Sequence, residues 1–307
     1  MNISPQVTRI RASGAKSKTR LSALRILWGN GRARWGLTIL AVMVLVAVFA
    51  PVLSPYSPSS TNFAPSLPPS WHHLLGTTLQ GQDIFSQLIS GTRNSLGVGL
   101  AVGVIATALS LVIGVLPTMG SPGVNAVFST FTNIVLILPG LPLLIVISAY
   151  LHSSGAITIA LIIGFTGWAW GSRILRSQAM TLRERDFVVA ARLAGASNFR
   201  LLRREILPNM GSLVLSHFMF AILFGILAEA GLQFLGLANV TAVSWGSMLY
   251  WAQSGSAMAL GMWWWFVPPG FAIAIVGVAL SMVNSGMDQI SNPRLRRAST
   301  KKGRISP

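Results

Sequence analysis

Long apolar runs separated by polar segments dominate the chain. They cover about residues 35–53, 94–116, 126–150, 157–172, 211–235 and 266–283. Each is close in length to the roughly 20 residues that an α-helix needs to cross the hydrocarbon core of a bilayer. Backbone groups in that core must be satisfied within the protein, and a helix does this locally. The pattern predicts an all-α polytopic membrane protein with six transmembrane helices.

The third run is interrupted by the sequence Pro139-Gly140-Leu141-Pro142. Proline removes a backbone donor and clashes with the preceding turn, so the helix must kink or break here. A broken helix at membrane depth is tolerated only where protein or a water-filled cavity covers the freed backbone. Pro139 and Pro142 are therefore expected either to line a pathway or to make a simple packing kink.

Small residues recur on one face of the second run. Ser95, Gly99 and Gly103 are four residues apart, so they share one side of a helix. In lipid, such faces let two helix backbones approach closely. We expect a tight helix contact at this face.

Two polar segments are expected outside the membrane. Residues 54–93, which contain Asp83 and Arg93, are rich in proline and serine and cannot be helical throughout. Residues 236–265 carry five tryptophans, and tryptophan rings favour the headgroup level, so this segment is expected along the outer interface. Span 35–53 then precedes the first segment, and residues 94–285 form a five-helix core.

The basic residues predict the orientation. Charged residues make up 9% of the sequence, compared with about 25% in soluble domains. With six spans, 22 of the 23 Lys and Arg residues lie on one side, in an arm (1–34), a block (173–209) and a tail (286–307). Only Arg93 lies on the other side. Because positive residues stay on the cytoplasmic side, both termini are expected in the cytoplasm.

Composition also excludes several kinds of chemistry. The chain has no cysteine, so it has no disulfide and no thiolate nucleophile. It has no His-x-x-x-His pattern and no Gly-x4-Gly-Lys-Ser/Thr phosphate loop. The arginines flank apolar runs and form no separate basic domain, which argues against a nucleic-acid partner. We expect a non-catalytic chain with no cofactor and no metal; the adjacent His72 and His73 lack a third ligand.

The block between spans four and five predicts two short amphipathic helices. Asp186 is placed to cap the first and Ser197 the second, Gly195 to end the first in a left-handed residue, and Pro208 to stop the second. One apolar face would contain Phe187, Ala190, Ala191 and Ala194, and the other Phe199, Leu202 and Ile206. The loop 183–209 would present an apolar knob ringed by arginines to a cytoplasmic partner. The alternative is a helix lying flat on the inner leaflet.

At this loop the chain resembles a known family. Ala190-Ala191, Gly195 and Leu207-Pro208 are similar to the Glu-Ala-Ala…Gly…Leu-Pro loop of permeases in bacterial ABC importers. In that family the loop is a coupling helix that sits in a cleft of the ATPase subunit. The resemblance carries this role to Asp186, Phe187, Ala190, Ala191, Gly195, Ala196, Leu202, Leu207 and Pro208.

Further segments resemble the dipeptide/oligopeptide/nickel branch of these permeases. They are residues 76–96, 138–143, 229–236, 244–246 and 292–296. The chain departs from the family pattern in places. Val189 stands where the family's glutamate sits, Glu205 where a histidine often precedes Ile-Leu-Pro, and Asn125 and Asn133 where acids are common.

The resemblance implies a type I ABC importer permease in the bacterial inner membrane. Its implied partners are a second homologous permease, two cytoplasmic ATPase subunits or domains, an extracytoplasmic substrate-binding protein and the lipid bilayer. Di- and oligopeptides are the expected substrates, with nickel or another small solute as the alternative. An ion-coupled carrier is a further alternative, but one intramembrane acid and one interrupted span give it little support.

Glu229 is the only acid inside a predicted span, and intramembrane ionisable residues are functional candidates. It would either line the pathway or gate its outer end, or else pair with Arg93 or a backbone group and hold helices together. Asp83 and Arg93 are expected to order the external segment.

Overall fold

The computed structural model describes residues 30–150 and 155–291. Most of the basic arm (1–34) and of the basic tail (286–307) lies outside these residues. The α-helices are α2 (Gly31–Val48), α3 (Ala50–Leu53), α4 (Ile84–Leu109), α5 (Pro122–Ile137), α6 (Gly140–Tyr150), α7 (Ala156–Arg183), α8 (Asp186–Leu193), α9 (Asn198–Leu201), α10 (Leu207–Asn209), α11 (Gly211–Phe234), α12 (Trp245–Ser254) and α13 (Trp263–Ser291).

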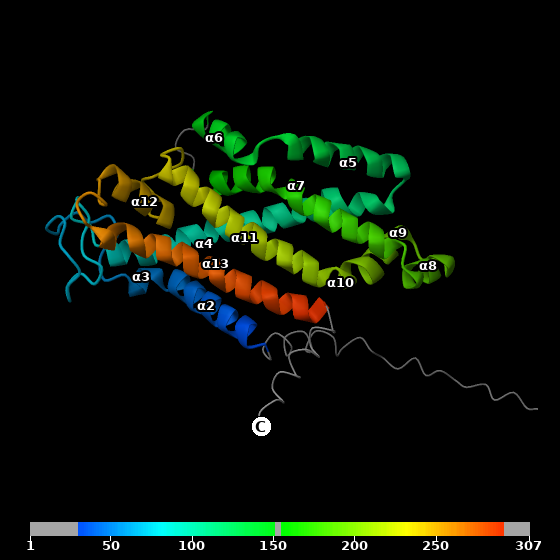
Figure 1. The fold of residues 1–307 in the computed structure, drawn as a ribbon, viewed down its shortest axis with the longest axis horizontal. Helices are drawn as coiled ribbons and strands as arrows, with labels where there is room; N and C mark the ends of the chain where they lie inside the picture. The colour runs from blue at the N-terminus through cyan, green and yellow to red at the C-terminus, as the bar shows by residue number, and fades with distance from the viewer. Residues whose placement is uncertain (1–29, 151–154, 292–307) are drawn as a thin grey trace, which may run out of the picture.

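Five helical segments of the described chain are long and apolar enough to cross a membrane. They belong to α2, α4 with its continuation to Met119, α7, α11 and α13. The pair α5 and α6, whose axes meet at 79°, makes a sixth candidate if the two helices count as one broken span. The all-α polytopic class is thus confirmed. In Figure 1, α4, α7, α11 and α13 run side by side along the long axis, with α2 on one edge and α5 and α6 on the other.

Helix boundaries differ from the predicted spans where a cap or a break decides them. α4 begins at Ile84, ahead of the predicted start at 94, because the Asp83 carboxylate accepts a bond from the Ser86 backbone N–H (2.8 Å). α4 then passes into a π-helical stretch, Ser110–Val115, and a 3₁₀ turn, Leu116–Met119. α7 continues to Arg183, so the charged block starts on the helix itself.

The predicted break in the third span is confirmed. α5 ends at Ile137, and Leu138 is extended with ψ at 128° because it precedes Pro139. α6 begins at Gly140 and turns away from α5.

The predicted small-residue contact is also found, between α4 and α11. A Cβ added at Gly99 would lie 2.5 Å from the Ile226 Cγ1 atom, and one at Gly103 would lie 2.6 Å from the Ile222 Cγ1 atom. Gly225 of α11 faces Val102 of α4 in the same way, at 2.7 Å. Glycines on both helices therefore let the backbones approach.

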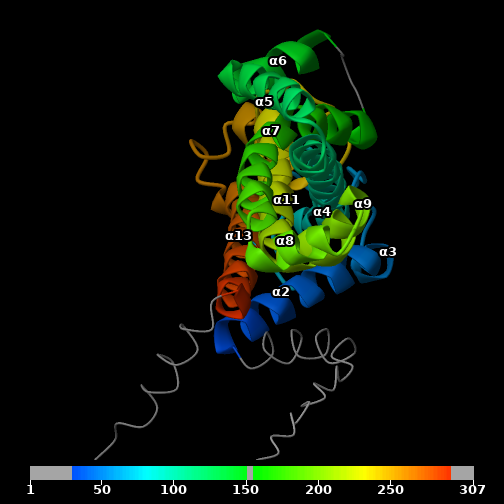
Figure 2. The ribbon, with the colours of Figure 1, turned by 90° about the vertical axis from the view of Figure 1, so that its right-hand side faces the viewer.

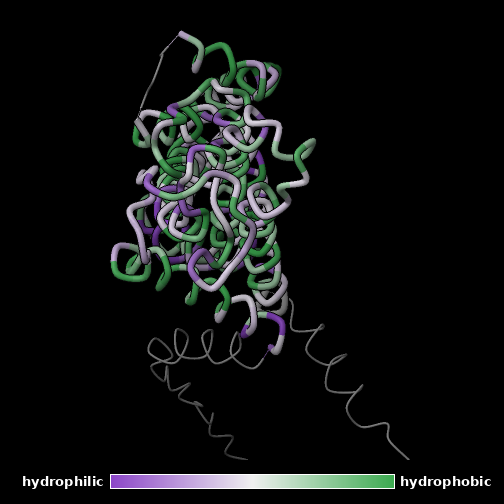
Figure 3. Tube along the Cα trace, turned by 90° about the vertical axis from the view of Figure 1, so that its left-hand side faces the viewer, coloured by the Kyte–Doolittle hydropathy of each residue, from purple (hydrophilic) through white to green (hydrophobic). Residues whose placement is uncertain are grey.

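The loops and α12 at one end of the bundle form a folded cap (residues 54–83 and 236–262). Figure 3 faces this end and shows hydrophilic positions among the loops. Trp263 is 53% exposed, but Trp245 and Trp265 are fully buried in the core. The rings of Trp245 and Trp265 thus fill space between α4, α11, α12 and α13, and the position of the segment 236–265 along the outer interface stays a prediction.

Candidate functional site

The loop between α7 and α11 lies at the end of the bundle opposite to the cap. Figure 2 looks onto this end and shows α8 and α9 in front of it. Gly195, with φ at +81°, turns the chain between them. Ser197 caps α9 by accepting a bond from the Arg200 backbone N–H (3.4 Å). Asp186, by contrast, is the first residue of α8 and makes no cap bond; Arg185 holds the cap position.

The inner face of the loop is apolar and anchored on α7. Val188 of α8 and Leu201, Leu202 and Ile206 of the following turns are buried together with Leu175 and Ala179 of α7. Ala191, Ala196 and Leu207 pack against this cluster. Leu202 and Leu207 therefore support the loop from inside. The predicted face that joined Phe199 to Leu202 and Ile206 is wrong, because the π-helical stretch Leu202–Ile206 turns those side chains inward.

The outer face of the loop carries exposed apolar side chains, which we call the apolar knob. They are Phe187, Val189, Leu193 (85% exposed) and Phe199 (67% exposed). Ala190, Gly195 and Pro208 of the same loop are also exposed. The exposed positions of Val189 and Leu193 were not predicted from the sequence, although their i, i+4 spacing marks a second apolar stripe on α8.

The arginines of this end divide into two sets. Arg183 donates to the Thr118 carbonyl (2.6 Å) and so ties α7 to the turn before α5, and Arg176 donates to the Asn125 side chain (3.1 Å) and so ties α7 to α5 itself. Asn125 thus still makes a polar contact where the family often has an acid. Arg185, Arg192, Arg200, Arg203 and Arg204 are exposed around the loop.

At the opposite end, Asp83 joins the cap to α4. Its side chain is 1% exposed; Oδ1 lies 2.9 Å from His73 Nδ1, and Oδ2 accepts a bond from the Ser86 hydroxyl (2.7 Å). The His73 ring packs against Tyr56 and Phe63. The described part of the chain contains no group of three or more His, Cys, Asp or Glu side chains that could hold a metal ion. The acidic partner of His73 is Asp83.

Replacing Asp83 with alanine is expected to loosen the cap. The change removes a helix N-cap and leaves a buried imidazole without its partner, a loss of about 3 kcal/mol. Limited proteolysis of detergent-solubilised protein should cut residues 54–83 faster. Ser57→Ala, which removes only an exposed hydroxyl contact to Ser59, is the control. Equal cleavage of both variants would show that Asp83 does not hold the cap.

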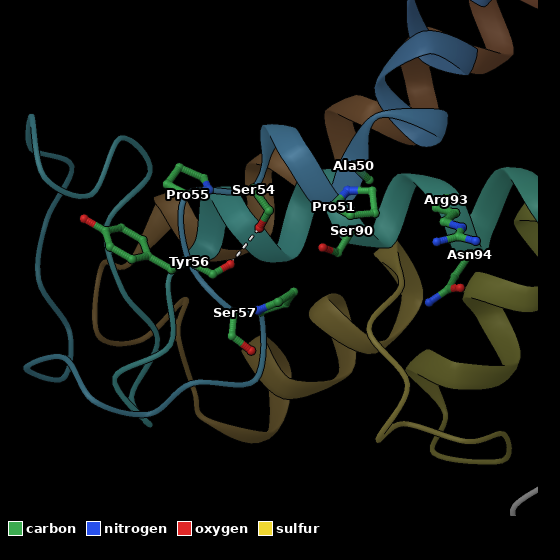
Figure 4. Close-up of a pocket in the computed structure, with 10 residues that line it drawn as sticks. Ala50, Pro51, Ser54, Pro55, Tyr56, Ser57, Ser90, Arg93 and Asn94 are labelled. Atoms are coloured by element: carbon green, nitrogen blue, oxygen red, sulfur yellow. Dashed lines mark hydrogen bonds between the residues drawn. The ribbon is translucent and has the colours of Figure 1, made fainter.

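A hollow of about 630 Å³ opens between the end of α3 and α4. Figure 4 shows Arg93 and Asn94 of α4 on one side of it, and Ser54, whose hydroxyl donates to the Tyr56 carbonyl, on the other. Asn94 also donates to the Val243 carbonyl (2.5 Å). Arg93 is exposed, and no contact of its guanidinium group with a carboxylate is found within residues 30–150 and 155–291. The suggested pairing of Arg93 with Glu229 is therefore wrong.

Glu229 lies inside the bundle, where α4, α11 and α12 meet. It is 2% exposed, its carboxyl group lies near the side chains of Ser95 and Gln233, and its Oε2 atom is buried without a hydrogen-bond partner among the described residues. Ser95 also accepts a bond from the Trp245 backbone N–H (3.2 Å), and Gln233 accepts one from the Ser244 hydroxyl. Glu229 thus belongs to a polar network that joins three helices.

A second cavity, of about 510 Å³, lies beside the break in the third span. We call it the mid-bundle cavity. Its lining residues are Ala106, Val135–Leu141, Thr166, Gly167, Ala169, Trp170, His217, Phe220, Ala221 and Phe224. Pro139 lines it, whereas Pro142 and Glu229 do not. His217 was not predicted as a site residue, because a lone histidine in an apolar run belongs to no motif with a recognisable spacing.

Comparison with known proteins identifies the family. The family described as "Binding-protein-dependent transport system inner membrane component" matches residues 106–297, which is more than half of the chain. The chain belongs to this family. A second family, "N-terminal TM domain of oligopeptide transport permease C", matches residues 21–69. The protein is therefore a multi-pass inner-membrane permease component of a binding-protein-dependent transport system.

Its relatives include named peptide permeases. A putative peptide transport system permease protein of Brucella abortus is 35% identical over 285 residues, which are 92% of this chain and 94% of the relative. The dipeptide transport system permease protein DppC of Bacillus subtilis is 33% identical over 282 residues, 90% of this chain and 86% of the relative. A putative peptide permease protein of Brucella suis is 32% identical over 267 residues, 86% and 88% of the two chains.

Proposed function

We propose that this permease imports di- or oligopeptides, driven by ATP hydrolysis on partner subunits. It would form the translocation pathway with a second, related permease and receive substrate from an extracytoplasmic binding protein. The observation that carries the substrate class is the match, over about nine-tenths of the chain, to permeases named for peptide transport. The placement of both termini in the cytoplasm follows from the distribution of basic residues.

The apolar knob is the proposed contact for the ATPase subunits. Leu193 and Phe199 expose large apolar surfaces among arginines, an arrangement that fits a helix inserted into a groove of a partner protein. The inner face of the same loop is packed on α7 through Val188, Leu175 and Ala179. A displacement of the loop by ATPase closure would therefore move α7 as well.

α7 connects that movement to the mid-bundle cavity. Thr166, Gly167 and Trp170 of α7 line the cavity together with α11 and the α5–α6 break. The α7 residues that pack against the loop and the α7 residues that line the cavity belong to one helix. A displacement of the loop would therefore also displace the cavity lining. Partner ATPases would bias two arrangements of the bundle, as any ligand shifts a conformational equilibrium through differential contacts.

The cap and the hollow at Arg93 form the proposed receiving face for the binding protein. Asp83 and His73 hold the cap in place, and Arg93 is the one basic residue assigned to this side. Glu229 is assigned a structural role, because it lies near Ser95 of α4 and Gln233 of α11, whose side chains in turn bond to the start of α12, and because it does not line the mid-bundle cavity.

Replacing Leu193 with glutamate is expected to weaken ATPase binding strongly while the permease still folds. Leu193 is 85% exposed, so the change should cost the isolated chain little folding stability. In the complex it would place a charge in an apolar contact. Truncations at such anchors cost about 2 kcal/mol or more of binding free energy, which is about thirtyfold in affinity. The measurement is co-purification of the co-encoded ATPases and peptide-stimulated ATP hydrolysis in proteoliposomes.

Leu74→Glu is the matched control, since Leu74 is half exposed at the opposite end of the bundle. It should leave ATPase binding unchanged. Import of labelled dipeptides and of nickel ions by the wild-type assembly decides the substrate class. Nickel uptake without peptide uptake would overturn the peptide proposal, and normal ATPase binding by Leu193→Glu would overturn the docking proposal.

A further inference from the structure

A hydrogen-bond acceptor faces the mid-bundle cavity. The Ser110 hydroxyl donates to the Trp168 carbonyl (2.8 Å) and also lies 3.2 Å from His217 Nε2. A hydroxyl has one hydrogen, and it is used toward the carbonyl. The oxygen must therefore accept from His217, which places the imidazole hydrogen on Nε2 and leaves Nδ1 as the acceptor of a neutral ring.

The surroundings keep the ring in this state and position. The cavity lining includes no acidic side chain, and a charge at membrane depth is costly without a partner. The ring lies directly against Gly171 of α7, where any Cβ would clash with its Cε1 and Nε2 atoms. Ser110 begins the π-helical stretch that interrupts α4. α4, α7 and α11 together thus fix the imidazole.

Nδ1 of His217 has no hydrogen-bond partner in the described chain, and it is not among the polar atoms enclosed without one. His217 lines the cavity, so Nδ1 is open to it. Of the other two polar side chains of the lining, Thr166 donates back to the Ile162 carbonyl of its own helix (2.8 Å), and Trp170 offers only an indole N–H, which is a donor. His217 Nδ1 is therefore an acceptor without a partner among the described residues of this largely apolar cavity.

We propose that the mid-bundle cavity is a transit site for the substrate, and that His217 Nδ1 accepts a hydrogen bond from an N–H group of a peptide, either its ammonium terminus or its backbone amide. This inference rests on the proposed function. Phe220, Phe224 and Trp170 supply apolar walls for side chains without selecting among them, and the residues of the α5–α6 break form one edge of the cavity. One directional polar contact with broad apolar walls suits a carrier of peptides of varied sequence.

The cysteine-free sequence permits a direct test of the site. Single variants Thr166→Cys and Phe220→Cys should react with a small maleimide in proteoliposomes, and a dipeptide with its binding protein and ATP should slow that reaction. Val278→Cys, on the exposed face of α13, is the control whose labelling the peptide should not change. Absence of protection at both cavity positions would overturn the transit site.

Variants of His217 test the acceptor. His217→Phe keeps a ring but loses Nδ1, and we expect dipeptide import to fall about tenfold, as for one lost hydrogen bond of roughly 1.4 kcal/mol. ATPase binding should stay at the wild-type level, since the apolar knob is untouched. His217→Gln, which retains an acceptor, should recover part of the import.

The outcomes separate this inference from the proposed function. If the wild-type assembly imports peptides and His217→Phe imports them equally well, the acceptor role is wrong and the importer proposal stands. If the wild type imports no peptide, the proposed function itself fails. If His217→Phe does not assemble, protection of the two cysteine variants tests the transit site. The acceptor role is then tested by comparing His217→Gln with an assembled His217→Ala variant. Equal dipeptide import by these two variants would overturn the acceptor role.

Discussion

Replacing Gly99 with leucine is expected to prevent normal packing of the bundle. The first added carbon would lie 2.5 Å from the Ile226 Cγ1 atom and 3.1 Å from the Ile222 carbonyl oxygen. The oxygen belongs to the backbone of α11, so relief requires that the two helices separate. Overpacking of a core typically costs about 1–3 kcal/mol, and separation of α4 from α11 also breaks the contacts of Glu229 with Ser95.

The measurement is the thermal stability and monodispersity of the detergent-solubilised protein. Gly97→Leu is the control, because Gly97 lies on the same helix and nothing is within 4 Å of its added Cβ. Gly97→Leu should behave as wild type, whereas Gly99→Leu should give a lower melting temperature or aggregated protein. Equal stability of the two variants would contradict the tight contact between α4 and α11.

Backbone requirements were the best predicted features of this fold. Ser95, Gly99 and Gly103 marked a close helix contact, and Pro139 marked a break, because each depends on local backbone chemistry. The left-handed turn at Gly195 followed from the same argument. Such features need no knowledge of what surrounds the helix.

Side-chain orientation was predicted less well, and the bilayer explains why. In a soluble protein an apolar residue is usually inside, but in a membrane both the core and the lipid-facing surface are apolar. Trp245 and Trp263 illustrate the difficulty, since one is fully buried and the other half exposed within the same segment. His217 was missed because its partner Ser110 is 107 positions away in the sequence.

The coupling loop shows the same limit outside the membrane. The sequence predicted that Phe199 shares a face with Leu202 and Ile206, but Phe199 is exposed and the other two are buried. On α8, one apolar stripe faces α7 through Val188 while another faces outward through Leu193. Periodicity alone does not distinguish these two stripes, because both repeat at helical spacing.

Replacing Gly195 with valine is expected to uncouple ATP hydrolysis from import. Gly195 has φ at +81°, a region that a β-branched residue enters only at a cost of roughly 1–3 kcal/mol. Nothing lies within 4 Å of an added Cβ, so the effect acts through the backbone turn and not through a clash. A changed turn would alter how Leu193 and Phe199 are presented together to the ATPase.

Asparagine at position 195 separates backbone strain from the loss of glycine itself. Asparagine tolerates the left-handed region, so Gly195→Asn should retain most of the import per ATP hydrolysed, whereas Gly195→Val should lose most of it at an unchanged level of membrane insertion. The ratio of dipeptide imported to phosphate released in proteoliposomes measures the coupling.

If valine and asparagine lower this ratio equally, glycine is required because the ATPase cleft has no room for a side chain. If neither lowers it, the turn between α8 and α9 does not transmit the movement. Val188, which packs α8 against α7, lies outside this turn, so a loss of coupling at an unchanged level of membrane insertion would be assigned to the presentation of the apolar knob.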